Sequence, residues 1–372
     1  MRYCAACVIP DTRPHICFDE YGVCNACRSH ATKRQIDWNA RKQAFAAVAA
    51  HARSRSTGYD CLIPVSGGKD STWQVVTCLA FGLNPLAVTW KTPARTPIGQ
   101  KNLDNLVRLG VDHIDYQVNP RVEKKFLRLT FERYGTTAIP MHLALFNIPL
   151  KIAVRFNIPL VVWGENSAFE YGGTDDERKG FALTDTWLRN YGVTHGTIAR
   201  DWVCEELTEK ELTPYFGPSA DELAARGILA VFLGYYFPWD PAETYRIARE
   251  HGFTSRAAGA KTGYYDYADI DDEFISIHHW LKWYKFGFTR LYDNLSLEIR
   301  NGRMSRAEAI DIIRERGDET PYEDIEKFCA FTGMSTRLFF EIAERFRNPR
   351  IWTKKNGSWY IENFLIPDWN WT

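Results

Sequence analysis

The stretch Ser66-Gly67-Gly68-Lys69-Asp70-Ser71 decides the fold class of this chain. It follows the apolar run 60–65, which has the length of a strand, and it precedes residues 72–80, whose apolar spacing is that of a helix. A glycine-rich turn between a strand and a helix points backbone N–H groups at an anion, and its glycines allow close approach without Cβ clashes. The stretch therefore predicts a phosphate-binding loop in an α/β fold, with an ordinary glycine turn as the alternative.

This loop departs from the Walker A pattern at two positions. Walker A needs Gly five residues before Gly68, where Ile63 stands, and Ser or Thr after the lysine, where Asp70 stands. The six residues instead resemble the pyrophosphate loop (PP-loop) of the ATP pyrophosphatase superfamily, whose members split ATP into AMP and pyrophosphate to activate a substrate oxygen. The resemblance implies a parallel-sheet domain like that of the adenine nucleotide alpha hydrolases, and the use of ATP with Mg²⁺.

Roles within the loop follow from that resemblance and from the chemistry of each residue. Backbone N–H groups and hydroxyls can bind the leaving pyrophosphate, a lysine can neutralise its charge, and a carboxylate can hold Mg²⁺. Pyrophosphate contacts are predicted from Ser66, Gly67, Gly68 and Ser71, charge neutralisation from Lys69, and the Mg²⁺ ligand from Asp70. Lys69 and Asp70 are thus the predicted catalytic residues.

Segments of strand length alternate with helical patterns around this loop. The strand segments are 61–65, 86–90, 113–118, 160–163 and 229–233, and the helical patterns are 71–81, 98–109, 121–134 and 142–156. The alternation predicts a mostly parallel sheet with helices on both faces. In such a sheet, ligands lie at the carboxyl ends of the strands.

Polar residues at two of these strand ends are candidates for the site. Thr89 lies near the end of the second strand segment, where an adenosine could bind, although a plain strand-to-loop transition is the alternative. Gly164, Glu165 and Asn166 follow the fourth strand segment. We assign Gly164 to the ATP site and the other two to Mg²⁺ or substrate, with a helix-capping loop as the alternative.

Two cysteine pairs open the chain. Cys4 and Cys7 form one C-x-x-C pair, and sixteen residues later Cys24 and Cys27 form another. Two such turns supply four thiolates to a tetrahedral zinc ion, and four thiolates leave no open position for chemistry. The spacing predicts a structural zinc site that helps this segment to fold, with a redox pair or coincidental cysteines as alternatives.

Composition narrows the class of protein. Lys and Arg total 46 of the 372 residues, as do Asp and Glu, so the formal net charge is zero, which argues against a chain whose main task is to grip nucleic acid. No apolar run of transmembrane length and no signal peptide is recognised. The odd count of nine cysteines fits a reducing compartment. We therefore expect a cytoplasmic protein without a membrane span.

Three regions are expected. They are a zinc-binding segment over 1–36, a PP-loop ATP pyrophosphatase domain over 37–255 and a helical C-terminal region over 256–372. The domain is expected to carry a polar insertion at about 165–215, read as a helical insertion or lid. The C-terminal region is predicted to hold one helix over 273–300, a helix that starts at Ser305 with Glu308 completing a capping box, and a final strand over 358–365.

Together these features resemble the bacterial N-acetyl sugar amidotransferases of surface-polysaccharide and nonulosonic-acid pathways. The resemblance rests on the Cys-rich opening over 4–27, the loop over 66–71, Trp163-Gly164-Glu165-Asn166 and Lys285-Phe286-Gly287-Phe288. It implies that ATP adenylates the acetamido oxygen of an N-acetylated, nucleotide-linked sugar, and that ammonia then replaces this oxygen to give an acetamidino group. The expected setting is lipopolysaccharide and O-antigen biosynthesis.

The source of ammonia is a separate inference. An N-terminal-nucleophile glutaminase needs Cys after the initiator Met, where Arg2 stands, and none of Cys61, Cys78, Cys204 and Cys329 lies in a glycine-rich nucleophile turn. We therefore expect ammonia from solution or from a partner glutaminase. The resemblance adds a cyclase-like subunit related to imidazole-glycerol-phosphate synthase.

Two rival classes remain open at this stage. A tRNA-thiolating enzyme can combine the same loop with zinc modules, but the neutral charge and the lack of a further Cys pair argue against it. A zinc-stabilised assembly subunit with a relic loop is opposed by the intact Lys69, Asp70 and serines.

Overall fold

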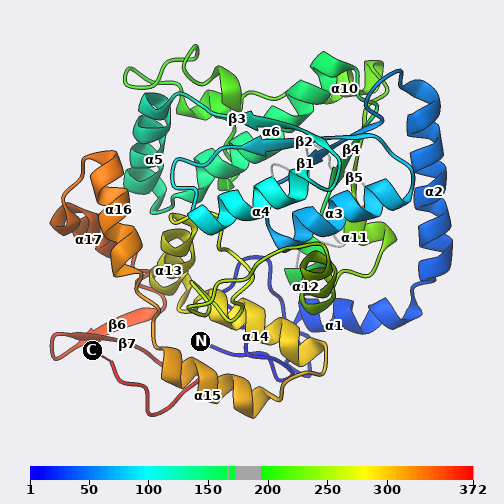
Figure 1. The fold of residues 1–372 in the computed structure, drawn as a ribbon. Helices are drawn as coiled ribbons and strands as arrows, with labels where there is room; N and C mark the ends of the chain where they lie inside the picture. Colours follow the sequence, from blue (N-terminus) through cyan, green and yellow to red (C-terminus); the bar gives the residue numbers. More distant parts are fainter. Residues whose placement is uncertain (166, 172–193, 372) are drawn as a thin grey trace.

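A computed structural model describes residues 1–165, 167–171 and 194–371 (Figure 1). Its centre is a parallel five-stranded sheet in the order β3-β2-β1-β4-β5. The strands are β1 Cys61–Pro64, β2 Pro85–Trp90, β3 Asp112–Tyr116, β4 Leu160–Trp163 and β5 Leu229–Phe232. The predicted parallel α/β fold is confirmed. Because the strand order reverses between β1 and β4, their carboxyl ends open a crevice of the kind that binds ligands in such sheets.

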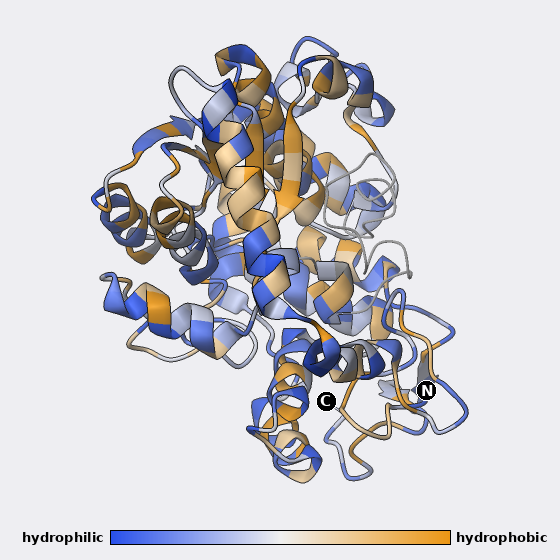
Figure 2. Ribbon diagram, turned by 90° about the vertical axis from the view of Figure 1, so that its right-hand side faces the viewer, coloured by the Kyte–Doolittle hydropathy of each residue, from blue (hydrophilic) through white to orange (hydrophobic). Residues whose placement is uncertain are grey.

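The sheet is buried on both faces, which explains its nearly continuous apolar strands. Along β1, Leu62 packs with Val122 and Phe126 on one face, whereas Cys61 and Ile63 belong to the core on the other face. Figure 2 shows these apolar strands enclosed by helices with hydrophilic outer residues. On the first face lie α5 Pro120–Tyr134 and α6 Ala138–Phe156, and on the second lie α2 Trp38–Arg55, α3 Lys69–Ala80 and α4 Pro97–Val107.

Helix α6 has the length and composition of a membrane-spanning helix, which the sequence analysis did not recognise. Half of its apolar window is buried inside the protein. Ile139, Leu143 and Ala153 pack into the core under the sheet. The helix is apolar because it packs in this core, and a single helix of this kind is weak evidence for a membrane span.

The C-terminal region is helical, as predicted, but two of its elements differ from expectation. The helix expected over 273–300 is two helices, α13 Ile275–Phe286 and α14 Arg290–Arg300. Gly287 ends α13 with φ +72°, and a Cβ there would lie 2.8 Å from Cδ1 of Ile361. The strand expected over 358–365 is only β7 Ser358–Ile361, which pairs with β6 Trp352–Lys355 in an antiparallel hairpin.

The predicted capping box at Ser305 and Glu308 is present at the start of helix α15, Arg306–Arg316. The remaining elements are α1 Asn25–Thr32, η1 Lys33–Gln35, α7 Ser167–Tyr171, η3 Ala199–Trp202, η4 Thr213–Tyr215, α10 Ala220–Ala225, α11 Leu233–Tyr236, α12 Pro241–Glu250, α15 Arg306–Arg316, α16 Tyr322–Thr332 and α17 Thr336–Arg345.

Part of the expected insertion at 165–215 belongs to the core. Trp202 and Tyr215 are fully buried, and both rings contact Phe126 of α5. Residues 199–215 therefore pack beside α5 and α6 and do not form a lid there. Residues 166 and 172–193 of this stretch lie outside the described part of the chain.

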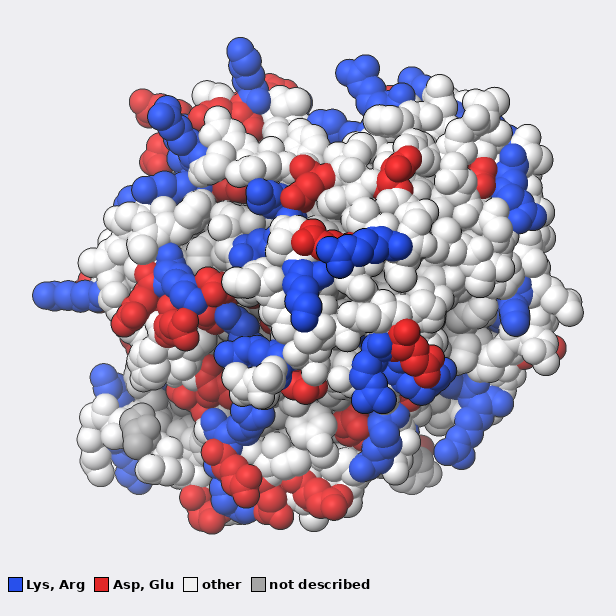
Figure 3. All heavy atoms as spheres, in the orientation of Figure 1, with Lys and Arg blue, Asp and Glu red and all other residues white. Residues whose placement is uncertain are grey.

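The two ends of the chain form one body. The cluster around Cys4, Val8 and Ile9 packs against Phe288 and Leu291 of the region near α14, and the β6–β7 hairpin closes the same cluster. Figure 1 shows the blue N-terminal segment running beside α14 and α15. The zinc segment is thus built onto the C-terminal helices. On the face shown in Figure 3, Lys and Arg lie among Asp and Glu.

Candidate active site

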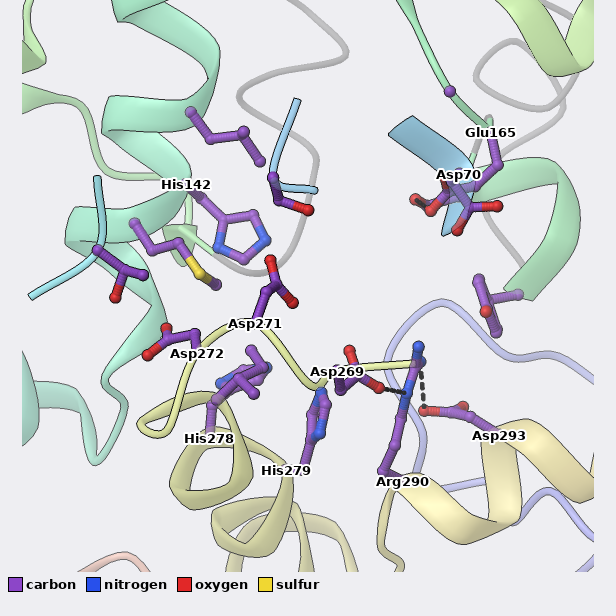
Figure 4. A pocket seen from close by; sticks show the side chains of 18 of the residues that line it. Asp70, His142, Glu165, Asp269, Asp271, Asp272, His278, His279, Arg290 and Asp293 are labelled. Atoms are coloured by element: carbon purple, nitrogen blue, oxygen red, sulfur yellow. Dashed lines mark hydrogen bonds and ion pairs between the residues drawn. The ribbon is translucent and has the colours of Figure 1, made fainter. Parts of the chain in front are cut away.

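A cavity of about 530 Å³ lies at the carboxyl ends of β1, β2 and β4. One wall is formed by these strand ends and the start of α3. The opposite wall is formed by α13, the start of α14, and the loop over 13–15 of the zinc segment (Figure 4). The cavity therefore joins all three expected regions. Of the predicted ATP and substrate residues, those in its lining are Ser66, Asp70, Ser71, Thr89, Gly164 and Glu165.

The loop after β1 is held in a tight conformation. Gly67 has φ +88°, and a Cβ there would lie 2.8 Å from the backbone nitrogen of Leu103 and 3.0 Å from the carbonyl oxygen of Gly99. The Ser66 N–H donates to Oγ of Ser71 at 3.0 Å, and the Gly68 N–H donates to Oγ of Ser66 at 3.2 Å. Gly68 also caps the start of α3. Only glycine fits at position 67, so that α4 can pack directly under the loop.

Lys69 does not belong to the lining of the cavity, and neither do Gly67 and Gly68. The Lys69 side chain is only 5% exposed, forms an ion pair with Asp70 and lies 5.4 Å from the ring centroid of Trp239. Nε1 of Trp239 donates to Oδ1 of Asp70 at 2.9 Å. Asp70 is thereby oriented from two sides, a support that sequence reasoning missed because Trp239 is distant along the chain.

Two carboxylates meet at the strand ends. Figure 4 shows Asp70 and Glu165 side by side at one end of the cavity. Burial, and then the charge of Asp70, raise the pKa of Glu165 to about 7. Two carboxylates in one place repel each other, and a divalent cation between them removes this cost. These two residues fit the oxygen ligands that Mg²⁺ prefers. Asn166, the third candidate here, lies outside the described residues.

Thr89 is placed at the end of β2 as predicted, but its hydroxyl already has a partner. Its Oγ1 lies 2.9 Å from Nε2 of His113, and the residue is 3% exposed. Nearby, Nε1 of Trp90 donates to Glu123 at 2.9 Å. On the side of the cavity next to β2, these polar side chains are therefore already hydrogen-bonded to one another within the protein.

Three aspartates of the loop before α13 complete this side, and sequence reasoning did not select them. Asp271 accepts a hydrogen bond from the Ser66 side chain, so it contacts the loop directly. Asp272 accepts from the Phe274 N–H at 2.9 Å, and burial raises its pKa to about 7. The run Asp269-Ile270-Asp271-Asp272 was the available signal, since three carboxylates in four residues are unusual before an apolar helix.

Cationic side chains dominate the opposite wall. Asp293, only 1% exposed, faces Arg13 at 2.7 Å, Lys282 at 3.2 Å and Arg290 at 3.8 Å. Burial alone would raise the pKa of Asp293, but these three cations outweigh it and hold the pKa well below its usual range. Arg290 also pairs with Asp269 at 3.2 Å. Through Arg13 the zinc segment contributes a side chain to the lining of the cavity, and the sequence analysis did not predict this contribution.

The four predicted zinc ligands converge. The Sγ atoms of Cys4, Cys7, Cys24 and Cys27 all lie within 4.8 Å of one another, with Cys7 and Cys24 at 3.8 Å and Cys4 and Cys27 at 4.0 Å. Four sulfurs about 2.3 Å from one zinc ion stand about 3.8 Å apart at the corners of a tetrahedron. The thiols therefore fit a structural zinc ion, which would join the two turns.

A partly buried arginine links this cluster to the cavity side of the protein. Nε of Arg300 donates to Sγ of Cys27 at 3.4 Å, and its Nη1 donates to the carbonyl oxygen of Glu170 at 3.0 Å. Hydrogen bonds from the neighbouring thiols, Cys24 first, together with the Arg300 charge hold the pKa of Cys7 well below its usual value. Arg300 thus offsets thiolate charge and ties the cluster to α7, which follows Glu165.

One comparison with known proteins covers the C-terminal part of the chain that contributes to this site. Residues 259–365 match the model of the family described as LPS biosynthesis protein WbpG-like, C-terminal domain. No curated protein matches the chain. Among solved structures, an NMN synthetase from Francisella tularensis aligns at 11% identity with a TM-score of 0.34, over 80% of this chain and 94% of that chain.

The matched segment contains α13 and α14, which form much of the wall opposite the loop, and the three aspartates, of which Asp271 contacts the loop itself. It also contains Lys285-Phe286-Gly287-Phe288, one of the segments on which the predicted family resemblance rests. Residues 259–365 are therefore similar to the C-terminal domain of WbpG-like lipopolysaccharide-biosynthesis proteins.

Proposed function

We propose that this protein is an ATP-dependent, AMP-forming amidotransferase that converts an acetamido group of an N-acetylated sugar into an acetamidino group for surface-polysaccharide (O-antigen) biosynthesis. The observation that carries the proposal is the cavity itself. A PP-loop-like sequence with two converging carboxylates forms one wall, and much of the other comes from a segment that matches a domain of lipopolysaccharide-biosynthesis proteins. ATP and a sugar substrate can meet in this cavity.

The residues suit the two steps of such a reaction. The acetamido oxygen attacks the α-phosphorus of ATP, pyrophosphate leaves, and ammonia then attacks the imidate carbon as AMP departs with the oxygen. Ser66 and Ser71 line the cavity next to the loop, where pyrophosphate would form and their hydroxyls could bind it. Asp70 and Glu165 would hold Mg²⁺, which neutralises the phosphate charge. No protein nucleophile is required.

Ammonia is proposed to come from a partner glutaminase, together with a cyclase-like subunit, or from solution. Cys61 and Cys78 are buried in the core beside β1, and Cys329 is buried among C-terminal helices. Cys204 is partly buried near Leu207. Among the described residues that line the cavity there is no cysteine. A glutaminase nucleophile is therefore expected on another chain, in the cytoplasm where ATP and nucleotide sugars are available.

The test is incubation with ATP, an ammonium salt and a panel of nucleotide-linked acetamido sugars, followed by mass spectrometry. Exchange of oxygen for NH lowers the sugar mass by about one unit and releases one AMP per product. Asp70→Ala is expected to abolish AMP formation while the zinc content stays at one per chain. Unchanged turnover in Asp70→Ala, or no mass change across the panel, contradicts the proposal. Tight, salt-sensitive tRNA binding would instead favour a thiolating enzyme.

A further inference from the structure

One face of α13 is basic and faces the cavity. His278, Lys282 and Lys285 follow one another at i, i+4 and i+7, so their side chains lie on the same side of the helix. All three line the cavity, as does His279. No carboxylate occurs between Ile275 and Phe286. The side chains of α13 that carry charge are therefore all basic, and they face the cavity on the wall opposite the loop.

The carboxylates beside this wall leave Lys285 without an ion pair among the described residues. The cations are Arg13, Lys282, Lys285 and Arg290, and the carboxylates that line the cavity beside them are Asp269, Asp271, Asp272 and Asp293. Three of the cations share Asp293. The carboxylates Asp70 and Glu165 belong to the strand-end side of the cavity, where Figure 4 shows them apart from α13. Asp70 and Glu165 are therefore no counter-charge for the cations of α13.

Lys285 is the cation of this wall without a carboxylate. Over 1–165, 167–171 and 194–371 its ammonium forms no ion pair, and it lies 5.7 Å from the ring centroid of Phe346. Burial lowers the pKa of Lys285 to about 7. Even partial burial of an ammonium group without a counter-charge costs free energy. A ligand anion would supply the missing charge.

His279 offers a second, independent sign of a missing partner. The residue is 5% exposed, and its Nδ1 has no hydrogen-bond partner among the described residues. Burial holds the pKa of His279 well below its usual range, so the ring is neutral and one nitrogen carries a proton. A neutral imidazole near the Lys282 ammonium group can donate to a carboxylate or phosphate oxygen. Figure 4 shows the ring directed from α13 toward the cavity.

We propose that Lys285, with Lys282 and His279, forms a binding subsite for an anionic group, a carboxylate or a phosphate, of the sugar substrate. This inference rests on the proposed function for its choice of substrate, and it makes that substrate an acidic or phosphorylated acetamido sugar. The anion lies against α13, and the acetamido group then extends toward the loop, where ATP would be held. A neutral sugar has no anionic group that could bind there.

Calorimetry tests the proposal with four probes. They are N-acetylglucosamine as the neutral probe, N-acetylglucosamine 1-phosphate and its uridine diphosphate ester as phosphate probes, and 2-acetamido-2-deoxyglucuronic acid as the carboxylate probe. Wild type is expected to bind at least one anionic probe tenfold or more tightly than the neutral sugar. Lys285→Gln should lower the affinity for that anionic probe about tenfold to 100-fold, since hydrogen bonds to charged groups are stronger than those between neutral groups. Binding of the neutral sugar should not change.

Matched variants separate the subsite from other effects. Lys285→Arg keeps the charge and should recover most of the affinity, and Lys42→Gln, at an exposed position of α2, should behave as wild type. ATP affinity should stay within about twofold in Lys285→Gln, because the loop lies on the other wall. The probe that loses affinity identifies the anion as phosphate or carboxylate.

Two results would overturn the subsite. One is a wild-type protein with no preference for any anionic probe. The other is a Lys285→Gln variant that loses ATP and sugar affinity equally or loses neither. These results are distinct from failure of the proposed function, which is read as the absence of AMP and of a mass change. Lys285-dependent anion binding without AMP formation would keep the subsite and refute the amidotransferase.

Discussion

Gly67→Ala is the substitution for which the structure makes the sharpest prediction. The new methyl group would stand 2.8 Å from the Leu103 nitrogen and 3.0 Å from the Gly99 oxygen, and both are backbone atoms of α4 that cannot rotate away. The left-handed φ of +88° adds about 1–2 kcal/mol for a residue with a Cβ. Overpacking adds about 1–3 kcal/mol. We expect a loss of about 2–5 kcal/mol in the free energy of unfolding.

The neighbouring glycine is the matched control. Gly68 has an ordinary φ of −69°, and its added Cβ would meet only Oγ of Ser66 at 3.2 Å, a side-chain atom that can rotate. As an N-cap residue of α3 it should lose about 1 kcal/mol on change to Ala. Gly58→Ala, with no atom within 4 Å of the new Cβ, should be neutral or stabilise by up to about 1 kcal/mol.

Urea unfolding followed by circular dichroism gives the stabilities, and calorimetry gives the ATP affinity. Gly67→Ala should weaken ATP binding more than Gly68→Ala, because only the first substitution forces the loop away from α4. Equal losses for the two glycines, or a Gly67→Ala variant as stable as wild type, would refute the reasoning that α4 fixes the loop through position 67.

The remaining predictions concern the zinc cluster and the basic wall. Cys24→Ser should lose zinc and solubility, because one missing thiolate opens the tetrahedron; full zinc occupancy by elemental analysis would contradict the four-cysteine site. Affinity for the anionic probe should fall about tenfold per pH unit from pH 7 to 9, since burial lowers the pKa of Lys285 to about 7 and only the ammonium form attracts an anion. The groups near it are Lys282, His195, His278 and the Phe346 ring, and burial keeps the two histidines neutral. A pH-independent affinity, or a slope that persists in Lys285→Gln, would contradict this.

The sheet was predictable from sequence because its signals are local. Each strand is a short apolar run, and burial on both faces requires that pattern. The loop was predictable because glycines and hydroxyls between a strand and a helix are typical of an anion-binding turn. The convergence of the four cysteines was predictable because each C-x-x-C pair needs only one turn.

The basic wall was not predictable, because its members converge only in three dimensions. Arg13, Lys282 and Asp293 come from three separate elements, and nothing local marks their meeting. The break between α13 and α14 was missed for a related reason. A glycine inside a helical pattern can be tolerated, and only the close packing of Ile361 against Gly287 shows that this one ends the helix.

The zinc segment does more than help the chain to fold, because it also contributes to the wall of the cavity. It inserts Arg13 against Asp293, Thr12 donates to the Phe286 carbonyl at the end of α13, and Arg300 of α14 contacts the sulfurs. Loss of the metal should therefore disturb α13 and α14, which carry the basic wall, more than the loop, which is fixed by β1, α3 and α4. Zinc would then control binding of the sugar while leaving the ATP side largely formed, because the two walls are held by different parts of the chain.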